Sequence, residues 1–292
     1  MKPLRTYMLI SFLLVLFEEI CLAVPPCPLV YNIGMKDTVS SGLLPSPAYI
    51  RDLISKPPSA PVIGTRRVVV ILVEFPDTRA SAKHPPSYYQ RLIFDTSYQG
   101  SLARYYEEVS YGLMRIEGVI AGNKWYKAKY PMFYYGRDGI SGTDSAYGPI
   151  YRLALEAVAL ADEDVDFSNF DMDGDRVVDH IMIIHAGEGQ ERSGRADDIW
   201  SHRWEVDSNP ILPGNQGLSV DGVYALGYTM QSENSPVGVF AHEFAHDLGI
   251  PDLYVEGAPS PVGRWSLMGH GAWLGNPPGS LPAHLDPWSK VL

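Results

Sequence analysis

Cysteine is almost absent from this chain, which has Cys21 and Cys27 and no other among its 292 residues. If an N-terminal segment is removed between these two positions, one thiol remains. A chain with a single cysteine forms no internal disulfide. Its stability must therefore come from a packed apolar core and from any ions that it binds.

Basic clusters and long apolar runs are also missing. The formal net charge is −11 and no run of Lys and Arg occurs, whereas nucleic-acid-binding proteins usually carry a basic patch. Beyond the N-terminus, no segment is apolar enough to span a bilayer. The sequence shows no internal repeat. These absences argue against a nucleic-acid partner and against a stable membrane anchor.

The N-terminus has the features of a secretory signal peptide. Lys2 and Arg5 form a positive end, and Met8–Phe17 is an apolar run that is short for a membrane span. The small residue Ala23 closes a cleavage site. We therefore predict a signal peptide over residues 1–23 and a secreted protein. The alternative is an uncleaved N-terminal anchor.

Residues 24–66 are rich in Pro and Ser, a composition that forms no packed core by itself. We interpret this stretch as a pro-segment or linker, and residues 67–292 as the folded domain. A β-branched run at 67–75 predicts a buried central strand. The remaining pattern predicts further strands at 113–121, 177–185, 199–203 and 223–230. It predicts helices at 87–94, 101–110 and 149–161. A last helix is expected to begin near residue 236. Alternating helices and strands predict an α/β (α+β) domain with a twisted mixed sheet.

The last helix carries the strongest chemical signal. His242 and His246 are four residues apart, so they lie one turn apart on one helix face, as a shared metal requires. Catalytic Zn²⁺ takes three protein ligands from imidazole nitrogens and carboxylate oxygens and keeps one position for water. Glu243 stands between the histidines and is placed to take a proton from that water. The alternative is an ordinary amphipathic helix in which the two histidines have hydrogen-bond partners and the Glu lies on the surface.

A third ligand is expected just past this helix. Gly249 tolerates positive φ and can turn the chain sharply, which would bring Asp252 back to the metal. Glu256 is a less favoured alternative because its offset fits the turn less well. Ser235 is the expected N-cap, with Pro236 at the first helical position.

A second metal site is predicted before the strand at 177–185. Alternating carboxylates around Gly174 describe a loop that wraps oxygen ligands around a hard cation such as Ca²⁺. Position 12 of an EF-hand would fall on His180, so this is a calcium loop of another kind with a structural role. The alternative is a solvated acidic turn. The expected ligands are Asn169, Asp171, Asp173, Asp175 and Asp179.

About residues 65–290 resemble the immune inhibitor A-type secreted metallopeptidases, a metzincin-like family of zinc proteases. The resemblance implies a metzincin-like fold, with zinc bound by His242, His246 and Asp252 and with Glu243 as the general base. It also implies that Met268 forms the Met-turn beneath the zinc and that the acidic loop is a structural calcium site. The matching stretches are Tyr105–Gly112, Asn169–Gly187, Ile199–Trp204, Val239–Tyr254 and Trp265–Gly269.

Other candidate groups keep ordinary interpretations. The side chains of His185, His202, His270 and His284 are expected to have structural roles, with a substrate or metal role as the lesser alternative. No Tyr follows Met268 closely, so no oxyanion-stabilising residue is identified. A thiolate at Cys27 could cap the zinc in a latent precursor, but a thiol without a role is favoured.

The sequence therefore predicts a secreted zinc endopeptidase that acts on proteins or peptides, with residues 67–292 as its catalytic domain. The rival hypothesis is a non-catalytic secreted binding protein, stabilised by metal, on the same fold. An intact Glu243 favours the enzyme, because a binding protein has no chemical need for that residue.

Overall fold

A computed structural model describes the side chains and backbone of residues 62–139, 144, 149–206, 217–254 and 260–291, and the backbone of residues 22–23. The predicted signal peptide and pro-segment lie almost wholly outside the described residues. Cys27 and Glu256, to which alternative metal roles were assigned, also lie outside them.

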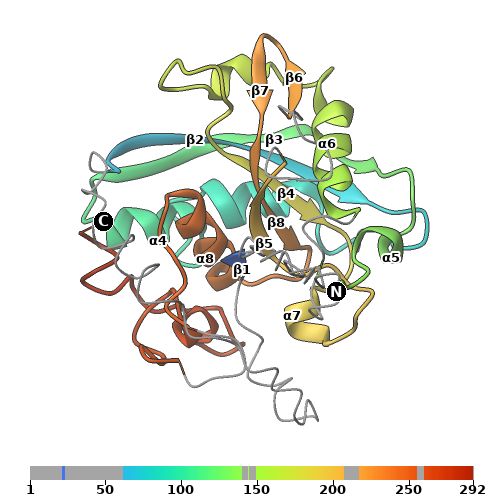
Figure 1. Cartoon of the computed structure of the whole chain (residues 1–292). Coiled ribbons are helices and arrows are strands. Elements are labelled where there is room, and N and C mark those ends of the chain that lie inside the picture. The colour runs from blue at the N-terminus through green and yellow to red at the C-terminus, as the bar shows by residue number, and fades with distance from the viewer. Residues whose placement is uncertain are drawn as a thin grey trace, which may run out of the picture.

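Within the described residues, six strands form one mixed sheet in the order β1-β5-β8-β4-β2-β3 (Figure 1). Strands β3, β2, β4 and β8 run parallel, and β5 is antiparallel to β8. A separate two-stranded hairpin is made by β6 and β7. The strands are β1 (Leu22–Ala23), β2 (Gly64–Glu74), β3 (Met114–Lys127), β4 (Ile181–His185), β5 (His202–Glu205), β6 (Leu218–Val220), β7 (Val223–Ala225) and β8 (Gly227–Ser232).

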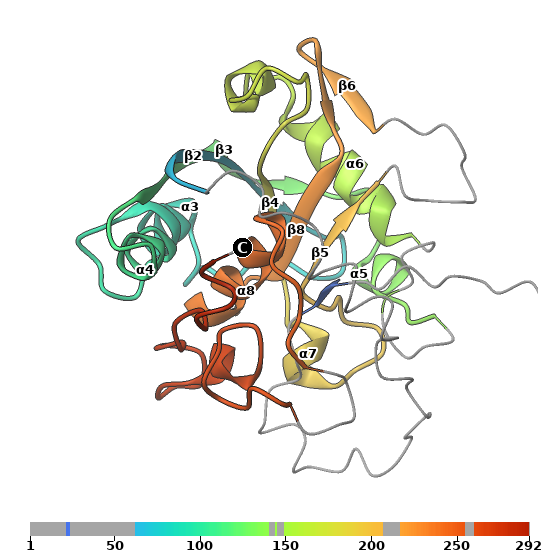
Figure 2. The same ribbon diagram turned by 60° about the vertical axis from the view of Figure 1, so that its left-hand side comes forward.

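Helices cover both faces of the sheet, as the two views in Figure 1 and Figure 2 show. On one face lies α6, and on the other lie α4 and α8. The architecture is thus mixed α/β, as the alternating sequence pattern predicts. The helices are α3 (Pro86–Tyr89), η1 (Gln90–Phe94), α4 (Leu102–Val109), α5 (Met132–Tyr135), α6 (Ile150–Ala161), η2 (Phe167–Phe170), α7 (Gln190–Ser193), α8 (Val237–Asp247) and η3 (His270–Trp273). No helix among these described residues is long and apolar enough to cross a membrane.

Strand β2 separates two apolar cores. Its residues 68–73 are all fully buried, because side chains on a strand alternate between faces and both faces are covered by helices. Val68, Val70 and Leu72 pack with α4 and α8, while Val69, Ile71 and Val73 pack with α6. The β-branched run that predicted this strand therefore supplies buried side chains to both apolar cores.

Helix α8 lies entirely within the protein. Every residue from Val237 to His246 is buried. Gly238 allows this close packing, since an added Cβ would lie 2.0 Å from the carbonyl oxygen of Ala272 in η3. A helix this enclosed holds its side chains in fixed directions, as a site built on it requires.

Three sequence predictions need correction at the level of local structure. The expected strand 177–185 is shortened to β4, because Val178 donates its N–H to Tyr224 in β7 and leaves the main sheet. The expected strand 223–230 divides into β7 and β8, which belong to different sheets. Ser235 is not the N-cap of α8. Pro236 occupies that position in an extended conformation, and the Ser235 hydroxyl accepts the Ser232 N–H instead.

Strand β5 lies beside α8 at the antiparallel side of the sheet. In the full chain its outer edge pairs with β1, where Leu22 faces Arg203 and Ala23 faces His202. These two residues end the predicted signal peptide. Cleavage after Ala23 would therefore remove β1 and leave β5 as the edge strand, with free backbone donors and acceptors.

Candidate metal centre

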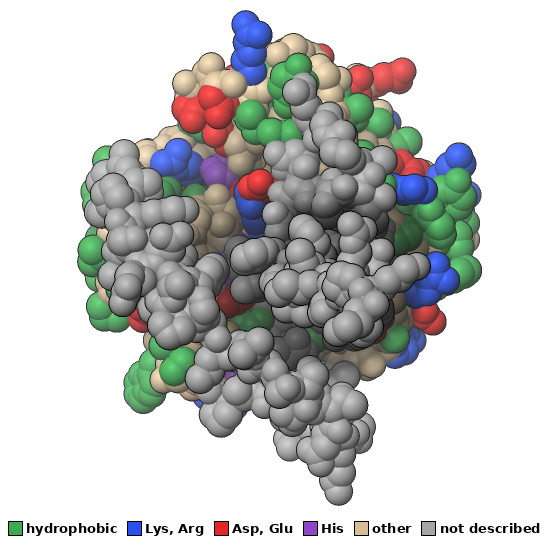
Figure 3. Space-filling model, in the orientation of Figure 1, with side chains coloured by type: hydrophobic (Ala, Val, Ile, Leu, Met, Phe, Trp, Pro, Cys, Tyr) green, Lys and Arg blue, Asp and Glu red, His purple; other side chains and the backbone are tan. Residues whose placement is uncertain are grey.

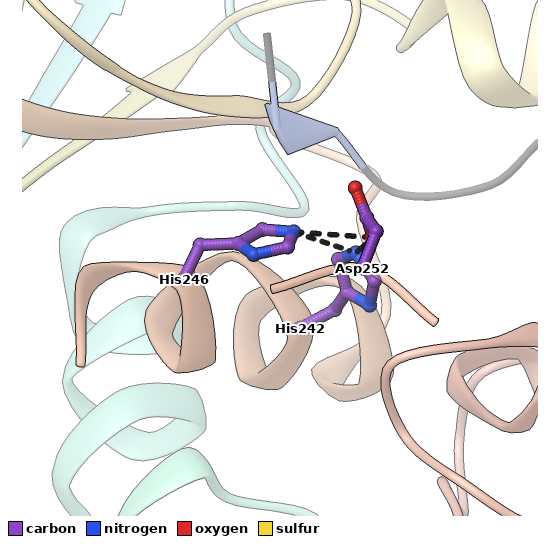
Figure 4. A group of neighbouring side chains, drawn as sticks. All are labelled: His242, His246 and Asp252. Atoms are coloured by element: carbon purple, nitrogen blue, oxygen red, sulfur yellow. Dashed lines mark hydrogen bonds and ion pairs between the residues drawn. The ribbon is translucent and has the colours of Figure 1, made fainter. Parts of the chain in front are cut away.

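Three predicted ligands meet above the middle of α8. His242 and His246 come from adjacent turns of the helix, and Asp252 comes from the loop that follows it (Figure 4). The two Nε2 atoms are 3.0 Å apart, and Asp252 Oδ1 lies 3.1 Å from His242 Nε2 and 3.4 Å from His246 Nε2. Atoms that share one tetrahedral Zn²⁺ at about 2.0–2.1 Å stand about 3.3 Å from one another. The donor set has the spacing that such a metal needs.

The turn that carries Asp252 forms as the sequence predicts. Gly249 has φ of +90°, a backbone conformation that favours glycine. The Ile250 N–H then donates to the carbonyl of Ala245, which closes the end of the helix. The reversal directs Asp252 back across α8 towards the two imidazoles.

Hydrogen bonds fix the orientation of both imidazole rings. His242 Nδ1 lies 3.0 Å from the Leu267 carbonyl oxygen, and His246 Nδ1 lies 2.7 Å from that of Ile250. Each Nδ1 therefore carries the proton and donates it, which leaves both Nε2 atoms with lone pairs. Two lone pairs and a carboxylate oxygen that converge without a proton repel one another. A cation between them removes this repulsion, so the residues fit a metal such as Zn²⁺.

The protonation states also suit a metal. Burial lowers the pKa of His246, which keeps its imidazole neutral. Burial alone would raise the pKa of Asp252, but the positive charge that either imidazole carries when it is protonated outweighs burial and holds that pKa below its ordinary value. A neutral histidine and an ionised carboxylate are the forms that bind a metal ion.

Glu243 is fully buried on the same turn of α8 as His242. A carboxylate enclosed beside a metal site is the group that general-base catalysis by water activation requires. Glu243 follows His242 directly in α8, so its side chain projects about 100° further around the helix axis.

Interactions from neighbouring elements hold α8 in place. Tyr106 in α4 is buried, donates its hydroxyl to the Ala241 carbonyl at 2.6 Å and packs edge-on against Phe244. At the C-terminal end of α8, Asp247 accepts from His180 Nδ1 at 2.7 Å and from Arg203 Nε at 3.3 Å. These contacts join α8 to α4, to the start of β4 and to β5. The sequence analysis gave none of these side chains a role.

Met268 lies in the apolar core below α8. It is fully buried and belongs to the same cluster as Ala241 and Ala245. Its carbonyl accepts the Leu253 N–H at 2.8 Å. The segment around Met268 thus supports both the helix and the loop that carries Asp252.

The acidic loop is compact and lies on the surface. One carboxylate oxygen from each of Asp171, Asp173 and Asp175 falls within 4.8 Å of the others. Backbone N–H groups bind the carboxylates in turn, as Gly174 N binds Asp171 Oδ1 at 2.8 Å. Asp179 is outside this group and accepts the Met172 N–H at 2.7 Å. The amide nitrogen of Asn169 donates to the Asp166 carbonyl at 3.3 Å. Acidic side chains gather at the upper left of Figure 3, where Figure 1 draws the segment between α6 and β4.

The other histidines fall into three environments. His185 and His202 are buried, and His202 lies 2.7 Å from the Trp200 carbonyl and 3.1 Å from the Tyr228 hydroxyl. His284 is exposed and pairs with Glu108 at 3.0 Å. His270 lies near Tyr254, whose ring is also close to His242. The ring of Tyr254 thus lies near both His270 and the candidate ligand His242.

Comparisons with known proteins agree with this geometry. Residues 62–292 match the model of the immune inhibitor A peptidase M6 catalytic domain. The chain is 34% identical over 272 residues to the Pre-pro-metalloprotease PrtV of Vibrio cholerae serotype O1, a match that covers 77% of this chain and 29% of the relative. It is 33% identical over 268 residues to Immune inhibitor A of Bacillus thuringiensis subsp. alesti, covering 77% of this chain and 39% of the relative.

The chain thus spans roughly a third of the length of these curated relatives. Among solved structures it is similar to metalloproteinase-II from Bacteroides fragilis, with 13% identity, a TM-score of 0.33 and coverage of 80% of this chain and 54% of that one. This low structural score adds nothing to the sequence matches.

Proposed function

The chain belongs to the immune inhibitor A peptidase M6 family, and from that premise we propose that it is a secreted zinc endopeptidase. The observation that carries the proposal is the convergence of His242 Nε2, His246 Nε2 and Asp252 Oδ1 beside the buried carboxylate of Glu243. We assign the two histidines and Asp252 as the zinc ligands. Met268 takes the place of the Met-turn of a metzincin-like fold.

The proposed reaction is hydrolysis of a peptide bond without a covalent intermediate. When bound, Zn²⁺ lowers the pKa of a coordinated water and polarises the scissile carbonyl. Glu243 takes a proton from the attacking water and later delivers it to the leaving amine. The carbonyl groups of Leu267 and Ile250 keep the two imidazoles in the tautomer that presents Nε2.

The outer edge of β5 is where we propose that substrate binds. A strand paired there lies close to α8, as β1 does in the full chain (Figure 4). An extended peptide can add to such an edge through backbone hydrogen bonds, which are independent of side-chain identity. This mode of binding suits an enzyme that accepts many protein sequences.

We further propose the processing that the N-terminal sequence implies. Residues 1–23 would be a signal peptide and residues 24–66 a pro-segment or linker, ahead of a catalytic domain at 67–292. The name of the Vibrio cholerae relative, Pre-pro-metalloprotease, supports this order. The proposal includes secretion and a substrate that is protein or peptide.

Proteolysis of an unstructured protein tests the proposed function. We expect the chain purified from culture medium to cut casein at internal bonds, and mass spectrometry of the fragments will identify them. A zinc chelator should abolish cleavage, whereas serine- and thiol-directed inhibitors should have no effect, because no side-chain nucleophile takes part. Full activity after exhaustive chelation would contradict the proposal. A zinc-loaded chain that cleaves nothing would favour the non-catalytic binding protein.

The acidic loop is proposed as a structural calcium site. The clustering of Asp171, Asp173 and Asp175 supports this, since hard cations prefer carboxylate oxygens and neighbouring like charges repel without one. Asn169 and Asp179 complete the proposed set of ligands. The loop leads through His180 to Asp247 at the end of α8, so an ordered loop would also steady the helix.

Calcium is therefore expected to raise the melting temperature of the chain. A ligand present at a hundred times its Kd stabilises the folded state by about 2.7 kcal/mol. Exchanging Asp171 and Asp173 together for Asn should remove the calcium-dependent shift in a thermal melt. Exchange of Asp162, an exposed residue at the C-terminal end of α6, for Asn is the control and should preserve the shift. If the double variant keeps the full shift, calcium binds elsewhere.

A further inference from the structure

One stretch of this acidic chain contains cations and aromatic rings but no carboxylate. Residues 118–137 include four Lys or Arg and six aromatic residues and no Asp or Glu, although the formal net charge of the whole chain is −11. The stretch forms the second half of β3 and all of α5. It supplies no ligand to the candidate metal centre, so its composition needs another explanation.

The short helix α5 turns two aromatic side chains outward. Met132 and Tyr135 are buried in the apolar core on the α6 side of the sheet. The two residues between them therefore project away from that core. Phe133 is 55% exposed, and Tyr134 is half-buried. The outer face of α5 is thus aromatic.

Tyr130, just before α5, extends this aromatic face. Its ring centroid is 4.5 Å from that of Tyr134, with the planes inclined by 39°. Tyr130 is 39% exposed. Together with Phe133, which neighbours Tyr134 in the helix, these rings form one exposed group. Exposed apolar side chains that gather in this way mark an interaction site, whereas single ones do not.

Two cations lie against these rings. Lys129 Nζ is 5.2 Å from the centroid of the Tyr130 ring, and Arg152 in α6 donates to the Tyr134 hydroxyl at 3.1 Å. Both cations are exposed, and neither forms an ion pair with any residue that the structure describes. Their charges are therefore available to a partner. The aromatic–basic surface, as we name it, consists of Lys129, Tyr130, Phe133, Tyr134 and Arg152.

The carboxylates nearest to the aromatic–basic surface bind backbone groups. Glu156 in α6 accepts the Lys129 N–H at 2.6 Å, and Asp77 accepts the Met132 N–H at 2.8 Å. Arg137, exposed just after α5, adds a further cation. Blue and green side chains lie together at the right-hand edge of Figure 3, where Figure 1 draws α5.

A lipid bilayer with anionic headgroups has the matching chemistry. Aromatic rings lie favourably at the boundary between headgroups and hydrocarbon, and Lys and Arg beside them are attracted to anionic lipids. The acidic remainder of the chain opposes this weakly, because charges more than about 10 Å away are screened at about 0.1 M ionic strength. A carbohydrate fits less well. Its hydroxyls also need acceptors, whereas Lys and Arg only donate.

We propose that the aromatic–basic surface docks the chain reversibly on a bilayer that contains anionic lipids. Phe133 and Tyr130 enter the headgroup boundary, while Lys129 and Arg152 contact the lipid phosphates. Such a contact is peripheral and requires no membrane-spanning segment. Because α5 packs on the α6 side of the sheet and α8 on the other, docking leaves the candidate metal centre uncovered (Figure 2).

Co-sedimentation with vesicles tests the charged part of this surface. The chain purified from culture medium should bind vesicles of phosphatidylcholine and phosphatidylglycerol in equal parts. Binding should weaken as salt is added and should be lower on phosphatidylcholine alone. Exchange of Lys129 and Arg152 together for Ala should weaken binding to the mixed vesicles about 30-fold, since each cation near an anionic membrane contributes about fivefold.

The control for this double variant exchanges Arg91 and Arg115 for Ala. Both are exposed cations, and Arg91 lies 4.2 Å from the Tyr98 ring centroid, much as Lys129 lies over Tyr130. Arg91 belongs to η1, whose buried residues pack in the core on the α8 side of the sheet. Vesicle binding by this control should equal that of the unaltered chain.

Exchange of Phe133 for Ser tests the aromatic part. Binding to both kinds of vesicle should fall about 10-fold, because an apolar ring no longer leaves water. Leu113→Ser, which removes a side chain that is 61% exposed before β3, is the matched control and should bind normally. All four variants should hydrolyse casein in solution as the unaltered chain does, which shows that they are folded.

Three results would overturn the proposal. These are no binding of the unaltered chain to mixed vesicles, full binding by the Lys129 and Arg152 double variant, and equal losses in the control variants. Binding to heparin but not to vesicles, if the double variant lost it, would assign the surface to an anionic polysaccharide instead. Vesicle binding does not depend on zinc or turnover. If no chain hydrolyses casein, circular dichroism replaces hydrolysis as the test of folding, and only the proposed function fails.

Discussion

Replacing Glu243 with glutamine is expected to lower kcat for peptide hydrolysis by about 10²–10⁴-fold, the contribution of a positioned general base. Glutamine has almost the same shape as glutamate but cannot accept the proton of the attacking water. Zinc should remain bound, because the proposed ligands are His242, His246 and Asp252 and not Glu243. The measurement is a kinetic assay on both chains beside metal analysis of the same samples.

Glu117→Gln provides the matched control for this experiment. Glu117 is exposed on β3, and its exchange makes the same chemical change away from the metal centre. Its kcat should equal that of the unaltered chain. If Glu243→Gln keeps both zinc and full activity, another group is the base and the assigned mechanism is wrong. If the variant loses zinc, Glu243 has a structural role in the site.

Acidification from about pH 6.5 to about pH 4 is expected to lower the free energy of unfolding by several kcal/mol. Burial lowers the pKa of His185 and of His202 from the ordinary 6.5 to about 4. In this range the unfolded chain binds more protons than the folded chain, so stability is present above the window and is lost as the pH falls. At 1.36 kcal/mol for each pKa unit, each histidine contributes about 3 kcal/mol.

Glu191 opposes this trend in part. Burial raises its pKa from 4.5 to about 6, so the folded chain binds its proton at a higher pH than the unfolded chain does. This contribution strengthens the fold as the pH falls and amounts to about 2 kcal/mol. The two histidines outweigh Glu191, so the combined contribution of these three groups to stability is lost in acid.

Urea denaturation at neutral pH and at about pH 4.5 will measure the net effect, and an NMR titration of the histidine rings will assign it. The signals of His185 and His202 should stay in the neutral form down to about pH 5. Ordinary titration of both buried rings near pH 6.5 would refute the explanation.

Much of the fold can be predicted from sequence where burial is complete. The β-branched run in β2 is unambiguous because both faces of that strand are covered, and α6 has clear helical spacing. Boundaries set by long-range pairing are not visible in the sequence. Val178 leaves the main sheet because it pairs with Tyr224, a partner 46 positions away, and no local pattern reports this.

The geometry of the candidate metal-binding group is predictable for a local reason. His242, Glu243, His246, Gly249 and Asp252 lie within one helix and one turn, so the geometry follows from helical periodicity and one positive φ. Side chains that reach the site from elsewhere are not predictable in this way. Tyr106, His180 and Arg203 contact α8 through tertiary packing, and only the folded chain places them there. Tyr254 lies two residues after Asp252 in the sequence, but only the structure shows that its ring is near that of His242.

Stepwise addition of zinc to the metal-free chain, with bound zinc and casein hydrolysis measured on each sample, tests most directly whether the site over α8 is a hydrolytic zinc centre. Hydrolysis should be absent without zinc, rise in proportion to bound zinc and level off at about one equivalent, as one three-ligand site requires. Asp252→Ala should weaken zinc binding and lose hydrolysis together. Hydrolysis by the zinc-free chain, or tight zinc binding and full hydrolysis in Asp252→Ala, would contradict the central assignment.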